Sequence, residues 1–164
     1  VFSNGDRFFR TGDLLRMDEQ GFVYFVDRIG DTFRWKGENV ATTEVSEVIN
    51  TVTGIKESVV YGVEVTGHDG RAGMAALVLG SDFDLDVLAR TLEDQLPIYA
   101  RPLFLRILPE PDLTGTFKHQ KSRLKTEGYS LDLQDDVLVR DAESGGYRKL
   151  DQEALDAIAA GARI

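Results

Sequence analysis

The feature that most constrains the fold is a glycine-containing reversal between two long β-forming segments. Residues 57–65 and 72–79 are rich in Val, Ala and Leu, and the turn sequence Gly-His-Asp-Gly separates them at residues 67–70. Two glycines supply the positive φ angles that a tight reversal needs, so this pattern predicts a β-hairpin. Earlier in the chain, the apolar runs 14–17 and 22–26 flank an Asp-Glu-Gln-Gly turn and predict a second hairpin.

Helical spacing of apolar residues predicts three helices. Thr42 or Thr43 is the expected cap of the first helix, Asp84 caps the second, and the last helix begins at Asp151 and stops at Gly161. The apolar positions of the first two are Val45, Val48, Ile49 and Val52, and Leu85, Leu88, Leu92 and Leu96. Residues 103–108 predict a further strand. Because strands and helices interleave without a βαβ period or an internal repeat, we expect an α+β fold with a short β-sheet flanked by helices.

Composition excludes several classes of function. The chain has 164 residues, no cysteine and a formal net charge of −9. That charge disfavours nucleic-acid binding, and the two distant histidines, His68 and His119, predict no metal site. Without a signal sequence or a long apolar run, we expect a soluble intracellular domain. Residues 114–125 form a local basic island that could bind an anion, and an acidic, solvated end follows it.

Three segments carry residues suited to chemistry. In the first, Asp13 follows a glycine and could accept hydrogen bonds from the two hydroxyls of a ribose, although a lone aspartate of this kind is more often a turn residue. The second, residues 26–40, combines glycines with six charged groups and could by itself be a charged hairpin. The third, residues 113–121, is a loop of small residues that leads to Lys118, a point charge suited to phosphate or carboxylate oxygens, or else a solvated helix start.

Taken together and in this order, the three segments resemble the late motifs of adenylate-forming enzymes, the superfamily of acyl-CoA synthetases, firefly luciferase and peptide-synthetase adenylation domains. The likeness is strongest to the fatty acid transport protein group, the very-long-chain acyl-CoA synthetases. The run Asp-Arg-Ile-Gly-Asp-Thr-Phe-Arg-Trp-Lys-Gly-Glu-Asn-Val at 27–40 and the run Thr-Gly-Thr-Phe-Lys at 114–118 carry this resemblance. Gly30 and Phe117 depart from the wider superfamily, and both departures agree with the transport-protein group.

The resemblance implies a role for each matched position. Asp13 and Arg28 would hold the ribose of ATP or acyl-AMP, and Gly30 would be the hinge between a large and a small domain. Gly37 would lie on the loop that faces the active site during thioester formation, and Trp35 would line the pantetheine path. Lys118 would be the catalytic lysine of adenylation. The binding residues would be Asp13, Arg28, Trp35 and Gly37, and Gly30 would allow the movement.

The resemblance also implies a domain organisation and a reaction. Residues 1–29 would end the large adenylation domain, and residues 30–164 would form the small mobile C-terminal domain. The whole enzyme would make acyl-CoA from a long or very long fatty acid, ATP and CoA through an acyl-adenylate, with Mg²⁺ held by ligands outside this chain. The chain alone would be inactive. Its setting would be cytoplasmic, with peripheral membrane association left open.

Two alternatives stay open. Within enzymes, the acid could be another bulky carboxylate, or the acceptor could be an acyl carrier protein instead of CoA. In a different class, the chain could be a stand-alone interaction module without catalysis. Retention of Asp13, Arg28, Gly37 and Lys118 together argues against the second alternative.

Overall fold

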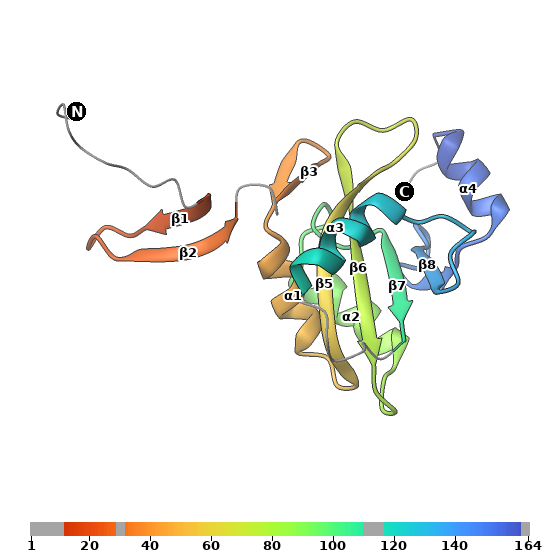
Figure 1. Ribbon diagram of the computed structural model, residues 1–164, viewed down its shortest axis with the longest axis horizontal. Coiled ribbons are helices and arrows are strands. Elements are labelled where there is room, and N and C mark those ends of the chain that lie inside the picture. Colours follow the sequence, from red (N-terminus) through yellow and green to blue (C-terminus); the bar gives the residue numbers. More distant parts are fainter. Residues whose placement is uncertain (1–11, 29–31, 110–116, 162–164) are drawn as a thin grey trace.

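The computed structural model describes residues 12–28, 32–109 and 117–161. The first described part is a hairpin of β1 (Asp13–Met17) and β2 (Val23–Arg28), paired antiparallel. Its turn is closed by Asp18, whose carboxylate accepts hydrogen bonds from the backbone N–H groups of Gln20 and Phe22. Figure 1 shows this hairpin set apart from the remaining strands and helices.

The hairpin predicted from residues 57–65 and 72–79 is confirmed, and it begins a five-stranded sheet in the order β5-β6-β7-β8-β9. The β6–β7 pair is parallel and the other pairs are antiparallel. A parallel pair needs a crossover connection, which here contains helix α2. The strands are β5 (Ile55–Glu64), β6 (Arg71–Leu79), β7 (Phe104–Leu108), β8 (Asp136–Arg140) and β9 (Tyr147–Lys149).

Both faces of the sheet are covered, because consecutive residues 60–63 and 72–78 are buried. Figure 1 shows α3 crossing in front of β5 and β6. The helices are α1 (Thr42–Asn50), α2 (Leu85–Gln95), α3 (Phe117–Glu127) and α4 (Gln152–Ala159). The α+β fold with a short sheet flanked by helices is therefore confirmed. None of the described helices combines the length and apolarity needed to span a membrane.

The helix caps follow the sequence prediction in two cases and differ in one. Asp84 accepts hydrogen bonds from two first-turn N–H groups of α2, and Asp151 accepts one from the N–H group of Ala154 in α4. The prediction of Thr42 or Thr43 as cap of α1 is wrong, because the N-cap is Ala41 and it makes no side-chain cap bond. Strand β4 (Glu38–Val40) ends one residue before the cap, and α1 begins at Thr42. The helix therefore starts earlier than it would with a threonine as its cap.

The acidic end of the chain is not simply solvated, which corrects that interpretation. Strands β8 and β9 extend the sheet beyond β7, and α4 packs on the same core. The apolar residues that this segment buries are Val137, Val139, Leu150, Ala154 and Ile158. Acids such as Asp151 and Asp156 lie between these buried residues in the sequence, so average charge concealed an amphipathic pattern.

Candidate functional site

The β1–β2 register brings the two expected ribose-binding residues to the same level of the hairpin. The Cα atom of Asp13 is the partner of the Cα atom of Arg28 in the antiparallel pair. Gly12, directly before Asp13, has a φ of 77°, a value that favours glycine. Asp13 is half-buried. Nothing is described of the Arg28 side chain, so the backbone register is the evidence for this pair.

Other expected positions lie outside the described residues. These are Gly30, residues 8–11 of the first motif and residues 114–116 of the loop before Lys118. Lys118 itself is the second residue of α3, and its side chain is not described. The helix that carries it is well anchored, because Leu124 is fully buried and the Lys121 ammonium donates a hydrogen bond to the Thr42 hydroxyl at 3.2 Å.

The far end of α3 is held by a buried ion cluster that the sequence analysis missed. The guanidinium of Arg106, on β7, lies 2.7 Å from the Glu127 carboxylate and 2.6 Å from the Asp135 carboxylate. The Arg106 side chain is only 3% exposed, so its charge must be balanced within the protein. Burial lowers the pKa of Arg106, but the hydrogen bonds to Asp135 and the ion pair with Glu127 outweigh this effect, and the pKa lies above its usual value. The available signal was an arginine inside the apolar run Phe-Leu-Arg-Ile-Leu.

The second motif folds as a tight hairpin of β3 (Phe33–Trp35) and β4 (Glu38–Val40), so its reading as a charged hairpin is correct in form. Its two turn residues are Lys36, with a φ of 50°, and Gly37, with a φ of 87°. Positive φ at both positions is the geometry of a type I′ turn, which favours glycine. A Cβ atom added at Gly37 would have no neighbour within 4 Å among the described residues. The turn is therefore exposed and open to another molecule.

Trp35 is buried, at 4% exposure, and its ring borders a cavity of about 320 Å³. Two arginines also line this cavity. Arg101 donates hydrogen bonds to the carbonyl oxygens of Glu93 and Leu96 at the end of α2, and the Arg140 Nε donates to the carbonyl oxygen of Gly145. The cavity thus combines an aromatic wall with two guanidinium groups and the carboxylates of Glu93 and Glu143.

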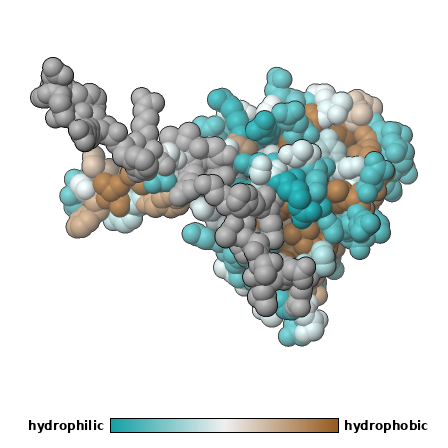
Figure 2. Space-filling model, in the orientation of Figure 1, coloured by the Kyte–Doolittle hydropathy of each residue, from teal (hydrophilic) through white to brown (hydrophobic). Residues whose placement is uncertain are grey.

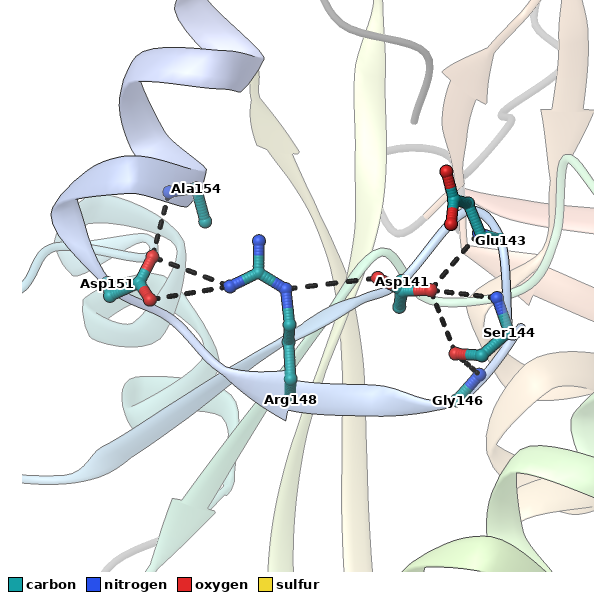
Figure 3. Close-up of polar contacts among 7 residues, drawn as sticks. All are labelled: Asp141, Glu143, Ser144, Gly146, Arg148, Asp151 and Ala154. Carbon is teal, nitrogen blue, oxygen red and sulfur yellow. Dashed lines mark hydrogen bonds and ion pairs between the residues drawn. The ribbon is translucent and has the colours of Figure 1, made fainter.

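Residues 142–145 of the β8–β9 loop also line the cavity. Asp141 stabilises the conformation of this loop. Figure 3 shows the Asp141 carboxylate turned into the loop, where it accepts hydrogen bonds from the Ser144 hydroxyl and the backbone N–H groups of Glu143 and Ser144. Hydrogen bonds from Ser144 and Glu143 lower the pKa of Asp141, although partial desolvation opposes them. Arg148 lies between the carboxylates of Asp141 and Asp151, so the loop and the start of α4 are linked.

Helix α3 and strand β3 lie on opposite faces of the five-stranded sheet. The Tyr61 side chain lies on the same face as Arg106 and Glu127 of α3, and both residues influence its pKa. Burial raises that pKa well above its usual value. The neighbouring Gly62 points the other way, toward Phe33 of β3. One small domain therefore presents the Lys118 helix and the Lys36–Gly37 turn on different sides.

The β1–β2 hairpin leaves one apolar face uncovered among the described residues. Leu15 pairs with Phe25 and Met17 pairs with Val23, so these four side chains share a face, and each is more than half exposed. The other face carries Arg16 over the ring of Tyr24, at 5.7 Å from its centroid. Figure 2 shows apolar surface on this hairpin.

Within the described parts of the chain, no group of three or more His, Cys, Asp or Glu side chains could hold a metal ion. His68 instead packs against the ring of Trp35, with 5.6 Å between the centroids. His119 has no described side chain.

Comparisons with known proteins agree on one superfamily. Residues 44–118 match the family model of the AMP-binding enzyme C-terminal domain. Long-chain fatty acid transport protein 3 from Homo sapiens is 52% identical over 98% of this chain, and long-chain fatty acid transport protein 1 from Homo sapiens is 47% identical over 99%. The chain spans about a quarter of the length of these relatives, 24% and 25% respectively.

Among solved structures, the chain is similar to O-succinylbenzoate coenzyme A synthetase from Bacillus subtilis in complex with AMP. The TM-score is 0.57 at 31% identity, over 65% of this chain and 21% of that one. The same synthetase has also been solved with ATP and a magnesium ion. The chain is thus homologous to the carboxy-terminal region of the long-chain fatty acid transport proteins and has the fold of the small domain of adenylate-forming ligases.

Proposed function

We propose that a protein containing this chain joins a long or very long fatty acid to CoA. In the first step a carboxylate oxygen of the acid attacks the α-phosphorus of ATP, which forms acyl-AMP and releases pyrophosphate. In the second step the CoA sulfur attacks the acyl carbonyl carbon, which forms acyl-CoA and releases AMP. The relatives' names support the acid class, and the similarity to a CoA synthetase supports the chemistry.

The observation that carries this proposal is the placement of α3 and the β3–β4 turn on opposite faces of one sheet. The two steps need different groups beside the same substrate carbon. A small domain that rotates about Gly30 would first present Lys118 and then the Lys36–Gly37 turn. The Lys118 ammonium would stabilise the charge that develops between the carboxylate and the α-phosphate, which is electrostatic catalysis and not proton transfer.

Binding roles follow from the same residues. Asp13 would accept hydrogen bonds from the ribose hydroxyls, and the β1–β2 register supports the participation of Arg28. The pantetheine arm of CoA would pass Gly37 and then Trp35, which borders a cavity with a mixed apolar and polar lining. Mg²⁺ would accompany ATP, with ligands from outside this chain.

The domain boundary is part of the proposal. We assign residues 1–29 to a large adenylation domain and residues 30–164 to the mobile domain. The apolar face formed by Leu15, Met17, Val23 and Phe25 supports this assignment, because a hairpin face of this kind normally packs against further structure. Such an enzyme would be cytoplasmic, and its membrane-soluble acid would favour peripheral contact with a bilayer.

The test uses a protein that contains this chain with its large domain, incubated with palmitate or a longer acid, ATP, Mg²⁺ and CoA. We expect acyl-CoA, AMP and pyrophosphate in equal amounts, and we expect the 164-residue chain alone to form no acyl-CoA. Absence of pyrophosphate release with every long-chain acid would overturn the proposal. Release that occurs only with another carboxylate, or transfer only to an acyl carrier protein, would favour the alternative ligases.

A further inference from the structure

The β3–β4 hairpin rests on a part of the sheet that has no side chains. Gly62 of β5 and Gly73 of β6 are direct partners in the β5–β6 pair. A Cβ atom added at Gly62 would lie 2.5 Å from the Cβ atom of Phe33, and one added at Gly73 would lie 3.0 Å from its Cζ atom. A side chain at Gly62 would overlap Phe33 and one at Gly73 would crowd its ring, so the two glycines let the ring lie close on the strands.

The β5–β6 turn, residues 67–70, holds the next two residues of β3. Gly70 forms an antiparallel bridge with Trp35, and a Cβ atom added at Gly70 would overlap the carbonyl oxygen of Arg34. From the same turn, the His68 ring packs against the Trp35 ring at an interplanar angle of 49°. The backbone and the side chain of this turn thus fix Arg34 and Trp35 together.

We propose that the 67–70 turn is the positioning element of the thioester-forming step, with Gly70 and His68 as its positioning residues. Lys36 and Gly37 follow Trp35 directly, so any displacement of Arg34 and Trp35 moves the exposed turn that would face the CoA thiol. Helix α3, which carries Lys118, lies on the opposite face of the sheet from β3. This role rests on the proposed function, and it predicts damage to the second step alone.

The chain offers a matched pair of substitutions to test this role. Gly67 and Gly70 belong to one turn and have similar φ values, 79° and 87°, so alanine strains the backbone in both. Only Gly70 abuts β3, because the nearest atom to a Cβ at Gly67 is a carbonyl oxygen 3.7 Å away. The difference between Gly70→Ala and Gly67→Ala therefore isolates the contact with Arg34.

In the enzyme that contains this chain, two half-reactions are measured: pyrophosphate release, and acyl-CoA formation from supplied acyl-AMP. Relative to Gly67→Ala, we expect Gly70→Ala to slow the second by about tenfold or more, since small misplacements at a reacting centre are costly. The first should change less than about twofold, since Lys118 keeps its place. Equal loss in both would indicate general destabilisation of the domain and would overturn the proposal.

Trp35 fluorescence gives a second readout that does not depend on activity, because Trp35 is the only tryptophan in the 164-residue chain. We expect Gly70→Ala to shift its emission to longer wavelength, whereas Gly67→Ala leaves it unchanged. An unchanged spectrum in Gly70→Ala would overturn the contact itself. If the enzyme that contains the chain has no ligase activity, the proposed function and this role both fail, but the fluorescence difference would still report the contact.

If Gly70→Ala does not fold, His68→Ala serves in its place, with the exposed neighbour Asp69→Ala as the control. His68→Phe keeps an aromatic ring beside Trp35 and should restore acyl-CoA formation from acyl-AMP. Failure of Phe to restore the rate, or equal rates for His68→Ala and Asp69→Ala, would contradict the positioning role of His68.

Discussion

Replacing Arg106 with Met should be among the most destabilising single changes in the chain. Met has a similar length but no charge, so the Glu127 and Asp135 carboxylates would lose the partner that now lies 2.7 Å and 2.6 Å away. Breaking a buried ion pair on one side costs about 3–5 kcal/mol. Because these carboxylates are 29% and 18% exposed and can be partly rehydrated, we expect a value near the lower end, about 3 kcal/mol.

The measurement is urea unfolding of the 164-residue chain, with Arg123→Ala as the matched control. Arg123 also contacts Glu127, at 3.4 Å, but its side chain is 61% exposed. A surface pair of this kind contributes about 0–1 kcal/mol, so the control should lower the free energy of unfolding by no more than that. Similar losses in the two variants would refute the reasoning that burial makes the Arg106 cluster strong.

Three further predictions concern Gly37, Gly30 and Asp141. Gly37→Asn should retain more thioester formation than Gly37→Leu, because Asn tolerates a φ near 87° far better, and separate assays of each half-reaction check this. Gly30→Pro should spare one half-reaction much more than the other, because proline fixes φ at the expected hinge; equal rates would contradict a hinge there. The pKa of Asp141 is lowered from 3.8, so its contribution to stability is present above pH 3.8 and is lost as the pH falls through the folded-state pKa. Asp141→Asn should therefore weaken the acid dependence of unfolding, and a carboxyl titration by NMR measures the shift directly.

Local sequence patterns predicted the elements whose signals are local. The long β5–β6 hairpin, the strand at Phe104–Leu108, and the helices capped by Asp84 and Asp151 all follow from turn residues, apolar spacing and capping side chains. The motifs likewise identified the turn at Gly37, whose positive φ is a local property. These features need no knowledge of what lies across the fold.

The features that were missed depend on contacts between distant segments. Arg106 meets Asp135 across 29 positions of sequence, and nothing near either residue predicts the other. Strands β8 and β9 are short, and they become strands because β8 pairs with β7 and β9 pairs with β8. The packing of Phe33 on Gly62 and Gly73 is also non-local, because the two glycines lie on β5 and β6 and contact Phe33 only in the folded chain. The site residues themselves came from resemblance, and their roles remain predictions.

The measurement that tests the central claim most directly is the pair of half-reaction rates of Lys118→Ala in the enzyme that contains this chain. Loss of one charged donor that acts in the adenylation transition state should cost about 3 kcal/mol, or roughly a hundredfold in pyrophosphate release. Acyl-CoA formation from supplied acyl-AMP should stay near the wild-type rate, because that step would use the opposite face of the domain. Equal slowing of both steps would contradict the account.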